Sequence, residues 1–172
     1  MTDRQGRAAI AARWWTARIA DRNSGAARGL AARLRRATPL EVLGEPAVQM
    51  LARELGFDHA RAETLVRLVQ VLAELREADA MPLARRLGGP EPAMSPLRFQ
   101  RLMRATGDEA TIVLRRAITM ADRRCNVARL AADLLVWDHP EWGDAARRRW
   151  IFDYFAAPQP GAADPSPQET DA

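Results

Sequence analysis

The 172-residue sequence contains no lysine, one cysteine and only two histidines. Because Cys125 has no partner cysteine, an internal disulfide cannot form, which suits a reducing compartment. No stretch approaches the ~20 consecutive apolar residues that a transmembrane helix needs. Arg7, Arg13 and Arg18 interrupt the N-terminal segment, so it lacks the hydrophobic region of a signal peptide. We therefore expect a soluble, cytoplasmic protein with no membrane partner.

Sequence signatures of enzymes are also missing. There is no glycine-rich phosphate loop, no cysteine or histidine spacing typical of a metal site, and no serine nucleophile elbow. The nearest polar constellation is WDHPEW, residues 137–142, and its proline and two tryptophans favour a loop that fixes one helix to the next. Cys125 is expected to be a core or boundary residue. The sequence predicts a non-enzymatic protein with no cofactor and no metal.

The positive charge is carried entirely by arginine and is segregated along the chain. Residues 1–37 carry a net charge of +7 and residues 93–129 carry +5, whereas residues 38–92 carry −3. Residues 130–156 carry −2, and the remaining C-terminal residues carry −3. A GC-rich genome also favours arginine over lysine, but the physical consequence is the same. Each guanidinium can bind phosphate in bidentate fashion and stack on a base, so the two basic segments favour a polyanionic partner.

Alanine, leucine and arginine dominate the sequence, which favours helix nearly everywhere. Helix starts are indicated by Thr38, Ser95, Asn126 and Asp144, and a helix end by Gly56. The predicted helices cover about 8–21, 26–37, a short turn from 39, 46–55, 59–78, 82–87, 96–105, 109–122, 127–137 and 145–156. The predicted fold class is all-α, a compact bundle of about eight short helices.

Glycine and proline place one internal boundary. Residues 88–92, Gly-Gly-Pro-Glu-Pro, cannot continue a helix, so they separate an N-terminal helical lobe (1–89) from a C-terminal one (90–156). Residues 157–172 are rich in proline, alanine and acidic residues, and we expect a disordered tail there.

Helical projection places the arginines of three helices on faces opposite the apolar residues. In 96–105 the three arginines lie within an arc of about 120°, and few acidic residues occur at i+3 or i+4 to neutralise the arginines of these helices. The predicted nucleic-acid-binding residues are Arg28, Arg33, Arg35, Arg36, Arg98, Arg101, Arg104, Arg115, Arg116 and Arg123. The tryptophans could stack on bases, but bulky residues on amphipathic helices more often anchor a core, which is the interpretation we favour.

The ordered segments also resemble a known family. ARWWTARIA is followed by SGAARGLAARLRRA in the first half, and SPLRFQRLMRATGDEATIVLRRAI by VARLAADLLVWDHPEWGDAARRRWIFDYF in the second. In order and spacing these segments are similar to the small subunit of the type I-E CRISPR effector complex Cascade, the CasB family, over roughly residues 8–156.

The resemblance implies an all-helical, non-catalytic subunit that sits as a head-to-tail pair and contacts the backbone subunits and the large subunit. It implies a basic surface that guides the displaced single-stranded DNA and stabilises the R-loop, with the guide RNA backbone as a further partner. The matching positions are Arg98, Arg101, Arg104, Arg115 and Arg116, with a looser match for the Leu-Arg-Arg segment at 34–36 and for Arg33.

Two other functions remain open from the residues alone. A regulator of the helix-turn-helix type would read duplex DNA with one recognition helix, although 96–105 shows no clear geometry of that kind. A purely architectural adaptor would use the same arginines to bind acidic neighbouring proteins.

Overall fold

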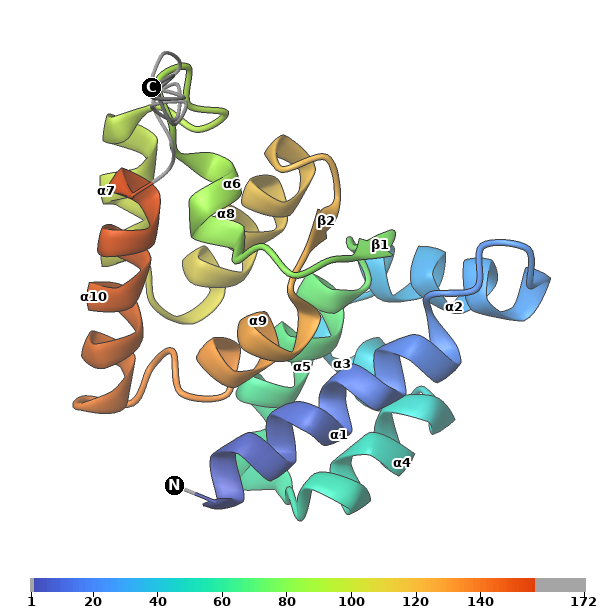
Figure 1. Cartoon of the computed structure of the whole chain (residues 1–172). Coiled ribbons are helices and arrows are strands. Elements are labelled where there is room, and N and C mark those ends of the chain that lie inside the picture. The colour runs from blue at the N-terminus through green and yellow to red at the C-terminus, as the bar shows by residue number, and fades with distance from the viewer. Residues whose placement is uncertain (1, 157–172) are drawn as a thin grey trace, which may run out of the picture.

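A computed structural model describes residues 2–156, which are mostly helical (Figure 1). The described residues form α1 (Thr2–Arg18), α2 (Gly25–Arg36), α3 (Pro39–Leu43), α4 (Pro46–Leu55), the 3-10 turn η1 (His59–Arg61), α5 (Ala62–Leu72), β1 (Glu77–Ala78), α6 (Leu83–Leu87), α7 (Pro96–Arg104), α8 (Gly107–Met120), β2 (Arg124–Cys125), α9 (Val127–Leu134) and α10 (Trp142–Phe155). The all-α prediction is confirmed, with ten α-helices in residues 2–156 where about eight were predicted; α3 and α6 are the shortest. The predicted tail, 157–172, lies outside the described residues.

Local capping chemistry sets most helix ends where the sequence predicts them. The side chains of Ser95 and Asn126 accept hydrogen bonds from backbone N–H groups three residues later, at 3.5 and 2.9 Å. Thr38 and Glu41 form a reciprocal capping box at the start of α3. Gly56 ends α4 with a φ of 68°, a conformation that glycine adopts without steric cost.

The helix predicted over 59–78 is wrong at its C-terminal end. Helix α5 stops at Leu72, and the chain then leaves the helical path. The backbone N–H groups of Arg76 and Glu77 donate to the carbonyl oxygen of Arg123, at 2.7 and 3.3 Å. Strands β1 and β2 continue this as a short parallel pair. The carbonyl oxygen of Arg123, which takes these N–H groups away from the helix, lies far away in the sequence. No local signal therefore marks the end of α5.

The start of α10 was also predicted wrongly. We expected Asp144 to cap a helix over 145–156, but α10 begins at Trp142. The Nδ1 atom of His139 accepts hydrogen bonds from the backbone N–H groups of Glu141 and Trp142, both at 3.3 Å. An imidazole therefore satisfies donors that an aspartate was expected to satisfy.

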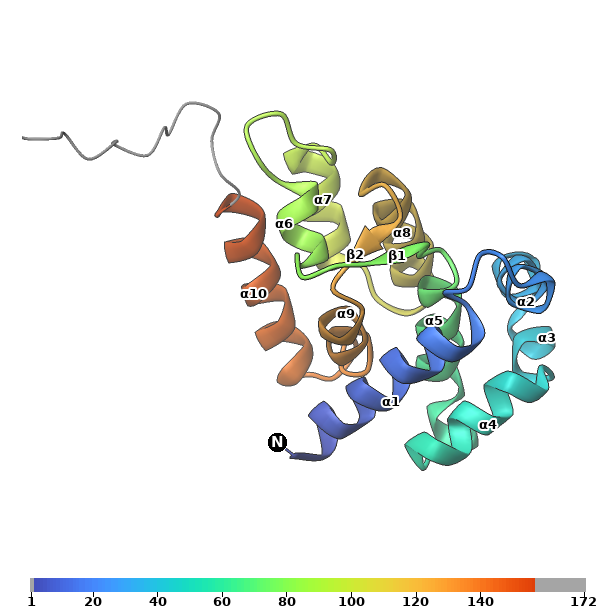
Figure 2. The same cartoon turned by 45° about the vertical axis from the view of Figure 1, so that its right-hand side comes forward.

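One continuous hydrophobic core joins the helices of both halves of the chain. Helix α1 packs along α9, α5 packs against α8, and α6 packs against α10. Figures 1 and 2 show α6, α7 and α10 gathered at one end of the molecule and α2, α3 and α4 at the other. The lobe boundary between residues 89 and 90 stays a prediction. Helix α1, before the boundary, contacts α9, after it, so the two predicted lobes pack against each other.

Four of the five tryptophans are core anchors, as expected. Their indole N–H groups donate to the carbonyl oxygens of Ala47 (from Trp14), Leu72 (from Trp15) and Ala105 (from Trp137), and to the Asp133 carboxylate (from Trp150), at 2.8–3.0 Å. Each buried indole thus has a partner for its polar atom, which burial would otherwise penalise. Trp142 differs, because it is 52% exposed.

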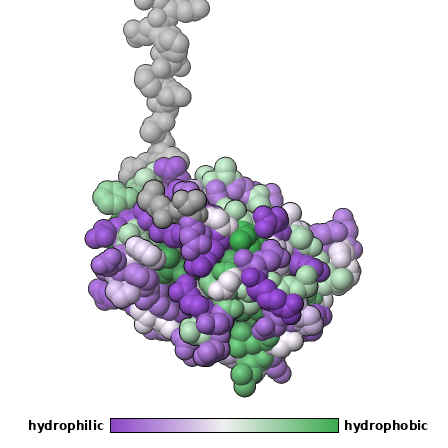
Figure 3. Space-filling view, turned by 90° about the horizontal axis from the view of Figure 1, so that it is seen from below, coloured by the Kyte–Doolittle hydropathy of each residue, from purple (hydrophilic) through white to green (hydrophobic). Residues whose placement is uncertain are grey.

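The face in Figure 3 is largely hydrophilic, with apolar residues gathered in a narrow strip. None of the helices in residues 2–156 is long and apolar enough to cross a bilayer. Cys125 is fully buried, as predicted, and burial raises the pKa of its thiol to about 12.

Candidate nucleic-acid interface

Helix α7 exposes three of the predicted arginines. Pro96 occupies its first turn, and Phe99 and Leu102 are buried against the core. That anchoring directs Arg98, Arg101 and Arg104 to solvent, as helical projection predicts. The predicted arrangement of this helix is therefore confirmed.

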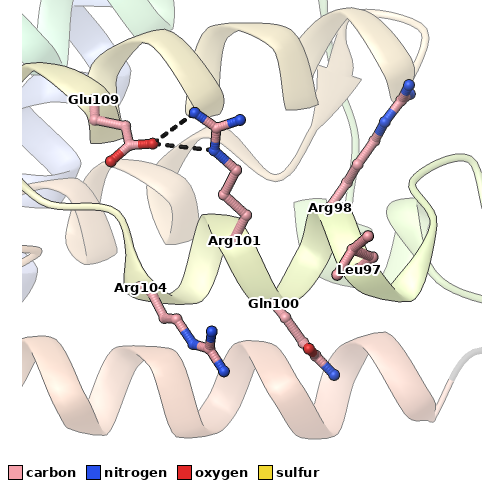
Figure 4. A pocket seen from close by; sticks show the side chains of 6 residues that line it. All are labelled: Leu97, Arg98, Gln100, Arg101, Arg104 and Glu109. Atoms are coloured by element: carbon pink, nitrogen blue, oxygen red, sulfur yellow. Dashed lines mark hydrogen bonds and ion pairs between the residues drawn. The ribbon is translucent and has the colours of Figure 1, made fainter.

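The three arginines of α7 have different surroundings (Figure 4). Arg101 donates to Oε1 of Glu109 on α8, from Nε at 3.0 Å and Nη2 at 2.8 Å. Arg98 and Arg104 make no side-chain hydrogen bond or ion pair within residues 2–156. Figure 4 shows Arg104 and Gln100 pointing toward α10, whereas Arg101 points toward α8.

Arg115 and Arg123 converge on one buried carboxylate, that of Glu74. Arg115 binds Oε1 through Nε at 2.9 Å and also donates from Nη2 to the carbonyl oxygen of Arg35 at 2.6 Å. Arg123 binds Oε2 at 2.7 Å from Nη1. Both guanidinium groups are mostly buried, at 27% exposure, so they tie α8 and the turn after it to the end of α5.

The N-terminal cluster on α2 is also partly occupied. Arg33 forms a 2.6 Å ion pair with Glu45, and this bond lowers the pKa of the Glu45 carboxyl. Arg35 donates to the carbonyl oxygen of Ala73 at 3.1 Å, and burial lowers the pKa of its guanidinium. Arg28 donates to the carbonyl oxygen of Arg22 at 2.9 Å. Arg36 is exposed on the same helix.

The ten predicted arginines thus fall into two groups. Six are engaged by protein atoms: Arg28, Arg33, Arg35, Arg101, Arg115 and Arg123. Four exposed arginines, Arg36, Arg98, Arg104 and Arg116, have no such bond inside the described part of the chain. As expected, these arginines have few acidic partners within their own helices. Arg33, Arg101 and Arg115 instead bind carboxylates from other elements.

Two hollows flank the exposed face of α7. One, of about 330 Å³, is lined by Leu97, Arg98, Gln100, Arg101, Arg104 and Glu109. The other, of about 260 Å³, lies between α7 and α10 and is lined by Pro96, Phe99, Gln100, Met103, Arg104, Ile151 and Phe155. Gln100 and Arg104 belong to both, so they form the wall between a basic hollow and an apolar one.

The apolar side of this region was not predicted. Leu97, Phe152 and Phe155 are 77%, 78% and 71% exposed. A signal was present, because residues 150–155, Trp-Ile-Phe-Asp-Tyr-Phe, place apolar side chains all around one helix. Such a helix buries one face and leaves apolar residues on another.

No group of three or more histidine, cysteine, aspartate or glutamate side chains arranged to hold a metal occurs in residues 2–156. In the WDHPEW segment, Asp138 is paired with the buried Arg67 and His139 caps α10. Both polar side chains therefore have structural partners, in agreement with the loop that the sequence predicts.

Comparison with known proteins identifies the family of the chain. The sequence profile described as CRISPR-associated protein Cse2 matches residues 30–155, well over half of the chain and all of α7, α8 and α10. Searches of curated proteins and of solved structures gave no significant match. The profile match, together with the all-helical fold, shows that the chain belongs to the CRISPR-associated Cse2 (CasB) family, the small subunit of the type I-E Cascade complex of CRISPR defence.

Proposed function

We propose that this subunit holds the displaced non-target DNA strand through phosphate contacts from its exposed arginines and so stabilises the R-loop, without a catalytic step. In RNA-guided recognition, base pairing with the guide reads the sequence. A subunit that retains the freed strand therefore needs charge and shape, and phosphate contacts supply position and not sequence specificity. The large subunit, the backbone subunits and a second copy of this chain are its proposed partners in the cytoplasm.

The observation that carries this proposal is the pair Arg98 and Arg104, exposed on one helix without an anion from residues 2–156 bound to either. The two side chains leave α7 on different sides (Figure 4), and each exposed guanidinium can bind a phosphate of a polyanion. Arg116 on α8 and Arg36 on α2 extend the set of available cations.

The engaged arginines have graded roles in this proposal. The Arg101–Glu109 pair is open to solvent, with side-chain exposures of 68% and 53%, so it is worth little and can exchange for a phosphate. Arg115 and Arg123 are held by buried Glu74, and they position α8 instead of binding the strand. The guide RNA backbone remains a second proposed ligand of the same cations.

The test is the double substitution R98A/R104A in the assembled complex on target DNA. We expect R-loop stability to fall on the order of tenfold and the salt dependence of strand binding to weaken by ~0.7 in log–log slope per lost contact. The matched control, R18A/R53A, removes two exposed charges from α1 and α4, at a distance from α7 in Figure 1, and should leave both quantities unchanged.

Two outcomes would contradict the proposal. Unchanged R-loop stability across the salt series would exclude Arg98 and Arg104 as strand contacts. Loss of the subunit from the complex, with strand binding by the isolated chain intact, would instead favour an architectural adaptor.

A further inference from the structure

The C-terminal end of α10 exposes two phenylalanine side chains, Phe152 and Phe155. Tyr154 stacks on Phe99 of α7, with ring centroids 4.0 Å apart, and this contact fixes α10 against α7. Phe155 meets Tyr154 edge-on at 5.1 Å, yet 71% of it remains exposed. The ring therefore contacts Tyr154 and leaves an exposed face beside the apolar hollow.

The rim of that hollow is cationic and polar. Arg104 and Gln100, one helical turn apart, both point toward α10 (Figure 4). The Gln100 side chain makes no hydrogen bond within residues 2–156, so its amide offers a free donor and a free acceptor. An aromatic face, an amide and a guanidinium thus surround one small apolar space.

The three groups match the three parts of one unpaired nucleotide. A base has an apolar face that stacks on an aromatic ring, an edge that bonds an amide, and a neighbouring phosphate that binds a cation. In a duplex the base faces are covered by their neighbours and the edges are paired. The hollow therefore suits single-stranded nucleic acid and not duplex.

The same rim argues against a second copy of the chain as the occupant. A symmetric contact through this hollow would place Arg104 and its copy in the same interface, and like charges across an interface are unfavourable. The surrounding charge is complementary to an anion.

Resting on the function proposed above, we propose that the hollow between α7 and α10 receives a base of the displaced strand, stacked on Phe155, with Arg104 on the adjacent phosphate. The subunit then distinguishes an unwound strand from a duplex by its exposed bases as well as by its charge.

The test compares F155L with F155W in the full-length chain, using oligothymidylate as the single-stranded probe and a duplex of mixed sequence as the second. F155L keeps an apolar side chain but removes the stacking face. Because Phe155 is 71% exposed, we expect the variant to keep its fold, which circular dichroism checks. We expect F155L to weaken single-strand binding about tenfold, with an unchanged salt slope and unchanged duplex binding. F155W should restore affinity, and W142L, which removes an exposed aromatic at the other end of α10, should have no effect.

A second measurement locates the base directly. Iodouracil placed in the displaced strand of target DNA should form a photo-crosslink to Phe155 in the assembled complex. Absence of that crosslink, or equal binding by F155L and the unmodified chain, would overturn the base site, while weaker binding by R98A/R104A would still uphold phosphate binding. Loss of F155L from the complex without any change in single-strand affinity would identify the face as a protein contact and also overturn the proposal.

Discussion

Two neighbouring arginines on α8 illustrate how much a residue's role depends on distant parts of the chain. Arg116 is exposed, whereas Arg115 is bound to Glu74, which lies 41 residues earlier in the sequence. Helical projection gives both residues the same polar face, and it could identify that face correctly. It could not identify the ion pair, because Glu74 becomes a neighbour only after α5 packs on α8.

Glu74 is one of the few buried charged residues, and its carboxylate binds two arginines. E74Q keeps the size of the side chain but leaves Arg115 and Arg123 without a carboxylate in a mostly buried setting. We expect the free energy of unfolding to fall by about 2–3 kcal/mol, measured by urea denaturation.

The comparison variant for this prediction is E54Q. Glu54 pairs with Arg13 at 3.6 Å, and both side chains are about half exposed or more, so its loss should cost less than about 0.5 kcal/mol. Equal effects of the two substitutions would contradict the role assigned to Glu74.

At the scale of single helices, α10 depends on an unusual cap. H139A removes the imidazole that accepts from two backbone N–H groups, so we expect a loss of about 1 kcal/mol in unfolding free energy. H139N retains an acceptor and should recover part of the lost stability.

The control for this prediction is D144A. It should cost less stability than H139A, because Asp144 forms only a 3.8 Å pair with Arg147. A larger effect of D144A would show that the cap is assigned to the wrong residue.

The stability contributed by the Arg33–Glu45 ion pair between α2 and the start of α4 depends on pH. The hydrogen bond from Arg33 holds the pKa of Glu45 below its ordinary value of 4.5, so its contribution is present above that value and is lost as the pH falls through the lower, folded-state pKa. The contribution is less than about 1 kcal/mol, because Arg33 is 58% exposed.

The measurement is urea denaturation of the unmodified chain and E45Q between about pH 7 and pH 3. The stability difference between the two should be constant near neutral pH and disappear at the acid end. A difference that grows on acidification would have the opposite sign and would rule out the assigned ion pair.

At the scale of the whole molecule, the sequence is sufficient to predict the helical class and most of the helices. Caps such as Ser95 and Asn126, and Pro96 directly after Ser95, act within a few residues, so a local pattern contains the information. The end of α5 and the apolar face beside α7 depend on partners distant in the sequence. The four exposed arginines could be proposed as a set but not separated from the engaged six.

The continuous core predicts one cooperative unfolding transition. Helices α1 and α9, and α6 and α10, join segments from both sides of the glycine-proline boundary, so neither lobe buries its apolar surface alone. Urea curves followed by tryptophan fluorescence and by far-ultraviolet circular dichroism should coincide. Two separated transitions would show that the lobes fold independently.

Gly88, at the end of α6, has no room for a side chain. Its φ of −87° is open to any residue, but a Cβ there would overlap the carbonyl oxygen of Tyr154 and lie 2.8 Å from its carbonyl carbon. Any substitution must therefore displace the last turn of α10, and Phe155 moves with it. Under the base site proposed above, G88A should therefore weaken strand binding through the displaced Phe155, although Gly88 does not line the hollow.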